Sequence, residues 1–221
     1  MSKFINEEKI KIENVEIAGI QTAMRGMRNP LDSWDKSDSE YVQCFEDGSG
    51  YFKIGEADLA LARKLIKAGN EHGKFLRHIY IGFDFTVPRH LWSEFDTYGF
   101  APKNSCSTMH TLLLKKRPIT LDMFVFHEEE LDIMKAIVDE LNILRCLYNS
   151  EGSTAEQKLE YKRRAKQLLP EGFLQKRTVA TNYAQIRNIY HQRKNHQLPE
   201  WRVIFREFAE SIPWAKDLII I

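Results

Sequence analysis

The 221-residue sequence carries few of the features that mark several large classes of protein. It has three cysteines, Cys44, Cys106 and Cys146, and no C-x-x-C pair, so neither a disulfide framework nor a structural zinc site is expected. No apolar run approaches the length that a membrane-spanning helix needs. The formal net charge is +1, so no strong overall field favours nucleic acid or an anionic membrane. Because the first stretch, MSKFINEEKIKIE, is also too charged for a signal peptide, the sequence predicts a cytoplasmic protein with free thiols and no membrane or nucleic-acid partner.

Strand-like and helix-like patterns follow one another irregularly along the chain. Residues 77–87 alternate apolar side chains toward one face, which predicts a strand, and a second strand is expected over 173–181. Helices are expected over residues 56–69, 88–98, 127–149, 154–168, 182–193 and 198–213. Residues 111–126 are expected to be extended and partly buried. Because the elements do not form regular βαβ units and no linker interrupts the chain, the sequence predicts an α+β fold in a single domain over residues 1–221.

The segment NSCSTMH, residues 104–110, combines amide, hydroxyl, thiol and imidazole groups. Cys106 could act as a nucleophile if a base such as His110 lowered the pKa of its thiol, but a separation of four residues does not guarantee that contact. A metal site would need two more ligands from other histidines, which show no known ligand spacing. A phosphate or base pocket could instead be lined by Asn104, Ser105, Ser107 and Thr108. On the residues alone, a polar turn is favoured.

Positive charge is concentrated in the C-terminal third. Residues 161–202 hold ten Lys and Arg against two Glu. This pattern is equally typical of a solvated surface and of an anion site, because Arg and Lys pair well with phosphate. RNA binding would need interleaved exposed aromatic residues, whereas Phe173, Tyr183 and Tyr190 are as readily core residues.

Three segments of the C-terminal third resemble motifs of the flavin-dependent thymidylate synthases, also called thymidylate synthase-complementing proteins. The segments are RAKQLLP (164–170), TNYAQIRNIYHQR (181–193) and PEWR (199–202). The family has an A-R-x-x-L-P segment, an N-x-R-x-x-x-N-F-x-x-x-R helix and an A-Q-x-E-I-R helix. The matching positions here are Ala165, Lys166 in place of arginine, Leu169, Pro170, Asn182, Asn188, Arg193 and, after one deletion, Glu200 and Arg202.

The resemblance extends upstream to about residue 70. His72 and His78 take the positions of the family's H-x-x-x-x-x-H pair. The signature R-H-R-x-x-S-x-N-E-x-S-x-R-Y falls on residues 97–110, where Asn104 and Ser107 match. The departures are Thr97-Tyr98-Gly99 in place of R-H-R, Ser105 in place of Glu, Met109 in place of Arg and His110 in place of Tyr.

The resemblance implies an antiparallel sheet with packed helices, and active sites formed between the subunits of a homotetramer. It implies an enzyme that binds FAD and transfers a methylene group from methylenetetrahydrofolate to dUMP or a related pyrimidine nucleotide, while NADPH reduces the flavin. FAD contacts are implied for His72, Tyr98, Asn182 and Asn188. Nucleotide contacts are implied for Asn104, Ser107, Lys166 and Arg193, with Ser107 and Arg193 in catalytic positions.

The spacing within residues 182–193 refines this picture. Because eleven residues of a helix return to nearly the same azimuth, Asn182 and Arg193 are expected to face one pocket. Gln185 and Ile189 are expected near that face and Arg187 off it. Cys106 is expected to be a bystander or part of the pocket wall. Two alternatives stay open: an enzyme that makes a modified pyrimidine nucleotide, including one that uses Cys106, and a catalytically inactive relative that binds a nucleotide, a flavin or a protein partner in a regulatory role.

Overall fold

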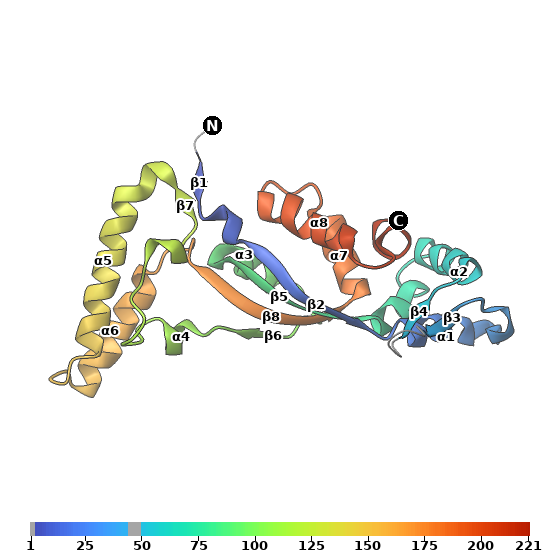
Figure 1. The fold of residues 1–221 in the computed structure, drawn as a ribbon, viewed down its shortest axis with the longest axis horizontal. Helices are drawn as coiled ribbons and strands as arrows, with labels where there is room; N and C mark the ends of the chain where they lie inside the picture. The colour runs from blue at the N-terminus through green and yellow to red at the C-terminus, as the bar shows by residue number, and fades with distance from the viewer. Residues whose placement is uncertain (1–2, 44–49) are drawn as a thin grey trace. The chain divides into compact units, whose positions relative to one another are not determined.

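The computed structural model describes residues 3–43 and 50–221, which form two compact units (Figure 1). The first unit contains the described residues of Met1–Lys11, together with Asp84–Thr97 and Lys103–Thr178. The second unit contains the described residues of Ile12–Phe83, together with Tyr98–Pro102 and Val179–Ile221. Cys44 lies outside the described residues, and the single domain over residues 1–221 stays a prediction.

A four-stranded sheet has the strand order β2-β5-β8-β6. Its strands are β2 (Lys11–Ala18), β5 (Tyr80–Pro88), β6 (Lys103–Ser105) and β8 (Leu174–Asn182). The alternation predicted for the strand near residue 80 is confirmed, because Ile81, Phe83 and Phe85 are each at most 1% exposed. Strands and helices are mixed without βαβ repetition, which confirms the α+β prediction.

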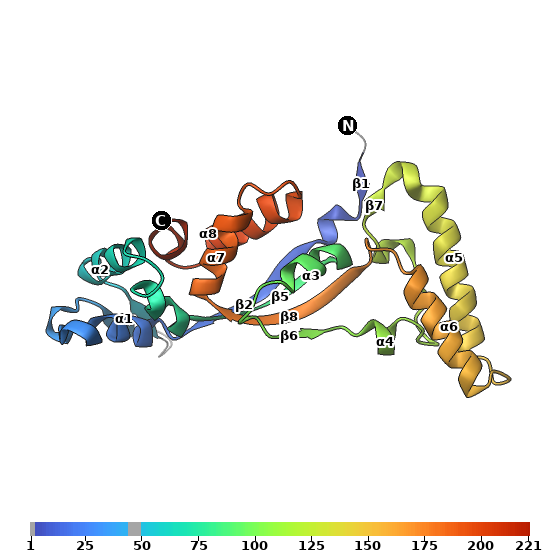
Figure 2. The same ribbon diagram turned by 180° about the vertical axis from the view of Figure 1, so that it is seen from behind.

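In the first unit, α5 (Leu131–Tyr148) and α6 (Ala155–Leu168) lie side by side in both ribbon views (Figure 2). Thr154 and Gln157 form a capping box at the start of α6, and His127 and Glu130 form one at the start of the short turn that leads into α5. The helix expected over residues 127–149 is confirmed, and α5 buries one apolar stripe. Its buried members are Met134, Val138, Leu141 and Leu144. The unit also contains β1 (Phe4–Ile5), η1 (Glu7–Lys9), α3 (Arg89–Phe95), α4 (Thr108–Thr111), η5 (Leu121–Met123), β7 (Phe126–His127) and η6 (Glu128–Glu130).

The prediction that residues 111–126 are extended is wrong for most of that segment. The segment runs through turns, with α4 at its start and the two-residue β7 at its end. Asn142 on α5 pairs with the backbone of this segment in place of a neighbouring strand. Its side chain accepts a hydrogen bond from the amide of Ile119 at 3.0 Å and donates one to the Ile119 carbonyl at 2.7 Å. Side-chain partners therefore satisfy the backbone where a strand ladder would otherwise be needed.

In the second unit, helices pack around the remaining part of the core. They are α1 (Ile20–Arg28), α2 (Glu56–Lys67), α7 (Tyr183–Arg193), α8 (Arg206–Ser211) and the shorter turns η2 (Asn29–Leu31), η3 (Trp34–Lys36) and η4 (Gly73–His78). Residues 200–205 and 216–220 form π-helical turns, η7 (Glu200–Phe205) and η8 (Lys216–Ile220). Because η7 continues directly into α8, the helix expected over 198–213 is confirmed with a π-helical first part. The fully buried side chains include Ile79, Tyr183, Ile186, Ile189, Trp201, Phe205, Leu218 and Ile219. A hairpin of β3 (Glu40–Gln43) and β4 (Gly50–Lys53) completes the unit.

A buried ion pair anchors the polar segment that follows α1. Arg28 is 4% exposed and Asp58, on α2, is fully buried. The Arg28 Nε donates to Asp58 Oδ1 at 2.5 Å, while the hydroxyls of Ser37 and Ser39 donate to Oδ2 at 2.6 and 2.5 Å. The carboxylate is therefore bonded on both oxygens, as a buried charge requires.

Among residues 3–43 and 50–221, every helix is too short or too polar to cross a lipid bilayer.

Candidate functional site

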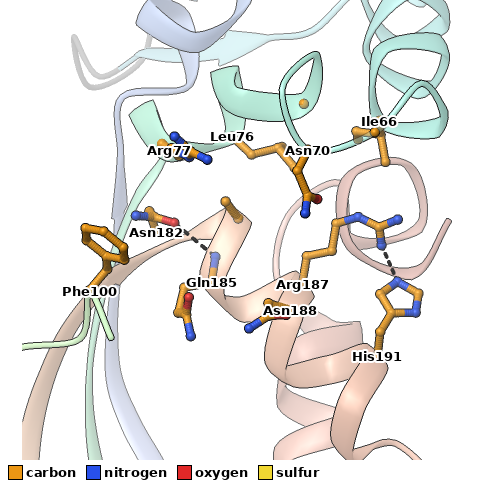
Figure 3. Close-up of a pocket in the computed structure, with 13 residues that line it drawn as sticks. Ile66, Asn70, Leu76, Arg77, Phe100, Asn182, Gln185, Arg187, Asn188 and His191 are labelled. Carbon is orange, nitrogen blue, oxygen red and sulfur yellow. Dashed lines mark hydrogen bonds between the residues drawn. The ribbon is translucent and has the colours of Figure 1, made fainter. Parts of the chain in front are cut away.

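A cavity of about 800 Å³ opens within the second unit (Figure 3). Its volume lies within the range of about 300–1,000 Å³ that is usual for small-molecule sites. One wall comes from the end of α2 and from η4, the other from α7, and Phe100 joins them from the 98–102 segment. The lining residues are Ile66, Gly69, Asn70, Gly73, Leu76, Arg77, Phe100, Asn182, Ala184, Gln185, Arg187, Asn188 and His191.

Asn182 has two roles in this geometry. It is the last residue of β8 and the N-cap of α7, where its Oδ1 accepts a hydrogen bond from the backbone amide of Gln185 at 3.0 Å. It also lines the cavity, together with the side chain of Gln185. The cap uses only the Asn182 oxygen, so the amide nitrogen of the same side chain is not consumed by it.

The cavity face of α7 is a helical stripe of Ala184, Arg187, Asn188 and His191. These positions follow the i, i+3, i+4, i+7 spacing of one helix face. The expectation that Arg187 points away from the pocket is therefore wrong. Asn182 reaches the same cavity because it stands at the helix end, where azimuth does not decide what a side chain can touch.

Arg193 lies outside the cavity lining, contrary to the expected shared pocket with Asn182. The eleven-residue spacing matches the azimuth of Asn182, but it also moves Arg193 about 16 Å along the helix axis, and the cavity stripe is on the opposite face of α7. The guanidinium of Arg193 instead lies 5.6 Å from the Tyr98 ring centroid and 5.0 Å from that of Trp201.

Tyr98 and Arg193, two of the residues singled out in the sequence, contact each other. The Arg193 Nε donates to the Tyr98 hydroxyl at 2.7 Å, and that hydroxyl donates to Gln192 Oε1 at 3.1 Å. The Gln192 amide nitrogen in turn donates to Asn188 Oδ1 at 2.9 Å. A chain of hydrogen bonds thus connects the cavity residue Asn188 to Arg193.

Arg187 and His191 lie together at one end of the cavity, where the guanidinium supplies a positive charge. Arg187 Nη1 donates to the backbone carbonyl of Ile219 at 3.0 Å, and His191 Nε2 lies 3.0 Å from the same oxygen and against the Arg187 guanidinium. Burial lowers the pKa of Arg187, but an arginine stays protonated in proteins. Burial, with a smaller effect of the Arg187 charge, also lowers the pKa of His191. The cavity therefore holds a partly desolvated cation beside an imidazole that favours its neutral form.

His72 is exposed and precedes η4, next to the lining residue Gly73 but outside the lining itself. Its implied contact with FAD stays a prediction.

Asn104, Ser107 and Lys166 belong to the first unit. Asn104 is exposed on β6, Ser107 is half-buried before α4, and Lys166 is half-buried in the last turn of α6. The carbonyl of Ser107 accepts the amides of His110 and Thr111 at 3.1 and 2.9 Å, which shows that the NSCSTMH segment forms a turn into a short helix. The implied nucleotide contacts of these three side chains stay predictions.

Cys106 is exposed in this turn. Its Sγ lies 3.8 Å from the Thr111 hydroxyl, and its backbone is held by the Lys176 carbonyl and the Gln175 side chain at 2.9 Å each. Within the described parts of the chain, no three His, Cys, Asp or Glu side chains come together as a metal site would require.

Two cations of the basic C-terminal third, Lys176 and Arg177, are paired inside the first unit. Arg177 donates to both carboxylate oxygens of Asp96 at 3.1 and 2.9 Å and lies 4.5 Å from the Trp92 ring centroid, and Lys176 pairs with Asp84 at 3.1 Å. These two cations serve the fold, whereas Arg187 faces the cavity.

Gln185 lines the cavity, as its place near the expected pocket face predicted, whereas Ile189 is fully buried and lies outside the lining. Arg77 and Phe100 are cavity residues that the sequence did not indicate. Arg77 carries only a weak signal, since it lies between the two histidines of the H-x-x-x-x-x-H pair. For Phe100 the sequence gives no signal, because its role depends on its backbone conformation.

The chain resembles known proteins in its three-dimensional structure. No protein-family model and no curated protein sequence matches the chain. Among solved structures, it is similar to the flavin-dependent thymidylate synthase of Helicobacter pylori complexed with FAD and dUMP, with a TM-score of 0.68 and 19% identity over 95% of this chain and 98% of that one. A second structure of the thymidylate synthase X of Helicobacter pylori with FAD and dUMP gives a TM-score of 0.67 and 17% identity over 96% and 97%. The chain therefore has the flavin-dependent thymidylate synthase fold, as the sequence resemblance implied.

Proposed function

We propose that the chain is a divergent flavin-dependent thymidylate synthase, an enzyme that binds FAD and reductively methylates dUMP or a related pyrimidine nucleotide. The observation that carries the proposal is the shared fold over 95% of the chain with structures that hold FAD and dUMP. The family motifs at Asn182 and Asn188 support it, because both side chains line the cavity of the second unit. The proposal includes methylenetetrahydrofolate and NADPH as co-substrates, a homotetramer and a cytoplasmic location.

The residues that line the cavity fit a flavin nucleotide. The amides of Asn182, Gln185 and Asn188 can donate to and accept from the polar edge of a flavin ring or its ribityl chain. Arg77 and Arg187 supply positive charge for phosphate groups. Bound FAD would supply the hydride chemistry that activates the pyrimidine.

The chain's own residues then have binding and positioning roles. Arg193, whose guanidinium is held over Tyr98 and Trp201 and is bonded to Tyr98 through Nε and to His196 through Nη1, would contribute its charge to nucleotide binding as the family motif implies. Ser107 and Lys166 would contact the nucleotide as the family motifs imply. Cys106 has no part in the reaction.

The test uses the purified full chain. We expect a flavin absorbance spectrum, a raised Tm with FAD and with dUMP, and turnover of dUMP with methylenetetrahydrofolate and NADPH. Cys106→Ser is expected to retain full activity, and loss of turnover in that variant would point to a thiol mechanism. Protein that carries no flavin and shows no shift in Tm with either ligand would overturn the proposal.

A regulatory relative without turnover is the second candidate. It is favoured by the loss of R-H-R at Thr97-Tyr98-Gly99 and by the engagement of Arg193 with Tyr98. Tight binding of FAD or dUMP by protein that neither turns over dUMP nor rescues a thymidine auxotroph would select it. Turnover of another pyrimidine nucleotide in place of dUMP would instead identify a modified-pyrimidine synthase.

A further inference from the structure

Phe100 combines two properties that the fold alone does not explain. Its side chain is 85% exposed, so it contributes little to the core. Its backbone φ is +52°, in the left-handed region that non-glycine residues rarely occupy and that is costly for a bulky side chain. An exposed aromatic residue with a strained backbone is costly to keep, and such residues concentrate at functional sites.

Neighbouring hydrogen bonds hold this conformation in place. The carbonyl of Phe100 accepts the Thr181 hydroxyl at 2.9 Å, and the carbonyl of Pro102 accepts the Ala180 amide at 3.1 Å. Two residues before Phe100, Tyr98 is 8% exposed and bonded to Arg193. The segment is therefore fixed at both ends, and the Phe100 ring is presented at the cavity.

The cavity is chemically different at its two ends (Figure 3). Phe100 lies at one end, Arg187 and His191 lie at the other, and the amides of Asn182 and Gln185 lie between them. An aromatic face accepts a planar ring, carboxamides accept its polar edge or a sugar, and a partly buried arginine accepts a phosphate. This order matches a ring joined to a phosphate through a polyhydroxyl or sugar chain.

We propose that Phe100 is a ring-stacking residue, against which the heteroaromatic ring of a nucleotide lies while the phosphate on the same half of the nucleotide reaches Arg187. The inference rests on the proposed function in taking a flavin nucleotide as the ligand. FAD offers two such halves, the flavin with its ribityl phosphate and the adenosine with its phosphate. Both share the chemistry that the cavity presents.

The experiment measures dissociation constants on the full chain with riboflavin, FMN, adenosine and AMP. Stacking on an aromatic residue is worth about 1–3 kcal/mol per base, which corresponds to a loss of about fivefold or more in affinity when the ring is removed. We expect Phe100→Ala to lower the affinity for the two flavin probes, or for the two adenine probes, by that factor. Phe100→Tyr should restore the affinity to within about twofold of that of the unaltered chain. Arg187→Gln is expected to lower the affinity for the phosphate-bearing probe of the affected pair, FMN or AMP. The affinity for its phosphate-free counterpart, riboflavin or adenosine, should not change.

A spectroscopic readout separates stacking from a general loss of structure. Flavin fluorescence is quenched by stacking, so a sensitive flavin pair should also show less quenching in Phe100→Ala. Phe4→Ala removes the ring of a phenylalanine that is 50% exposed, belongs to the first unit and lies outside the cavity, and it should change no dissociation constant.

Each outcome bears on one proposal or on both. If Phe100→Ala binds riboflavin and FMN more weakly, the flavin ring is the one that stacks on Phe100. If it binds adenosine and AMP more weakly, the adenine ring is the one that stacks there. If the protein binds FAD but Phe100→Ala binds all four probes as tightly as the unaltered chain, the stacking role is overturned and the proposed function stands. If the unaltered chain binds neither FAD nor any of the four probes, both are overturned.

Discussion

The Nε of Arg193, at the end of α7, donates a hydrogen bond of 2.7 Å to the hydroxyl of Tyr98, a residue 95 positions earlier in the chain. Tyr98 stands where the related family has the histidine of R-H-R, and Arg193 stands on the family's final helix arginine. The contact fixes the guanidinium over two aromatic rings and also anchors the segment that presents Phe100.

Removing the Tyr98 hydroxyl should therefore destabilise the second unit. Tyr98→Phe leaves Arg193 Nε and Gln192 Oε1 without the hydroxyl they share, and the free energy of unfolding is expected to fall by about 1–2 kcal/mol. Urea denaturation measures the change. Tyr41→Phe, on a ring that is 62% exposed, should cost less than about 0.5 kcal/mol, and equal effects of the two substitutions would contradict the buried contact.

The two roles of Asn182 can be separated by substitution. Asn182→Ala removes both the cap and the cavity amide, so it should lower stability by about 1 kcal/mol and also weaken FAD binding. Asn182→Ser replaces the carboxamide by a hydroxyl, whose oxygen can still cap α7 but which lacks the amide nitrogen. We expect it to unfold close to the unaltered chain in urea and yet to bind FAD as weakly as the alanine variant. Recovery of FAD affinity in the serine variant would show that the asparagine acts only as a cap.

The Arg28–Asp58 pair should be among the most sensitive positions in the second unit. Asp58→Ala leaves the Arg28 charge buried and unpaired, at a cost of about 3–5 kcal/mol in the free energy of unfolding. The matched control is Asp132→Ala in the exposed pair with Lys135, where the expected cost is below about 1 kcal/mol. Chemical denaturation of both variants gives the comparison, and a small effect at Asp58 would contradict the buried geometry.

His191 should make stability depend on pH in the weakly acidic range. Burial, assisted by the Arg187 charge, lowers the pKa of His191 below its ordinary value of 6.5. The unfolded chain therefore takes up a proton near pH 6.5 that the folded chain refuses, so stability falls as the pH is lowered through 6.5. His191→Asn should flatten this part of the profile when Tm is measured from pH 5 to pH 8, and an unchanged slope would assign the pH dependence to other groups.

Phe100→Gly should raise stability while it weakens ligand binding. Glycine adopts a positive φ without strain, which relieves about 1–2 kcal/mol, and the extra backbone entropy of glycine in the unfolded chain offsets about 0.5–1 kcal/mol of that gain. A rise in the free energy of unfolding of up to about 1.5 kcal/mol is expected, together with the loss of affinity expected for Phe100→Ala. A variant that is markedly less stable than the unaltered chain would show that the ring supports the fold.

Local patterns in the sequence are enough to predict the long helices and β5. The reason is that α5 and β5 each bury one face against the core, and their apolar residues recur at the period of that face. Local patterns do not predict the conformation of residues 111–126, because Asn142 supplies hydrogen bonds to that segment from another part of the chain. The same limit applies to the cavity. Asn182 and Asn188 could be predicted from motif spacing, whereas Arg187 and Phe100 depend on which face of α7 meets η4 and on one backbone angle.

The cavity draws on three separate parts of the chain: residues 66–77, Phe100 and residues 182–191. During synthesis, the wall formed by α2 and η4 leaves the ribosome about a hundred residues before α7 does. At a rate of about 5–20 residues per second, the interval is several seconds to tens of seconds. A ligand of this cavity therefore cannot guide the early folding of the nascent chain, because binding between the two walls must follow the emergence of α7.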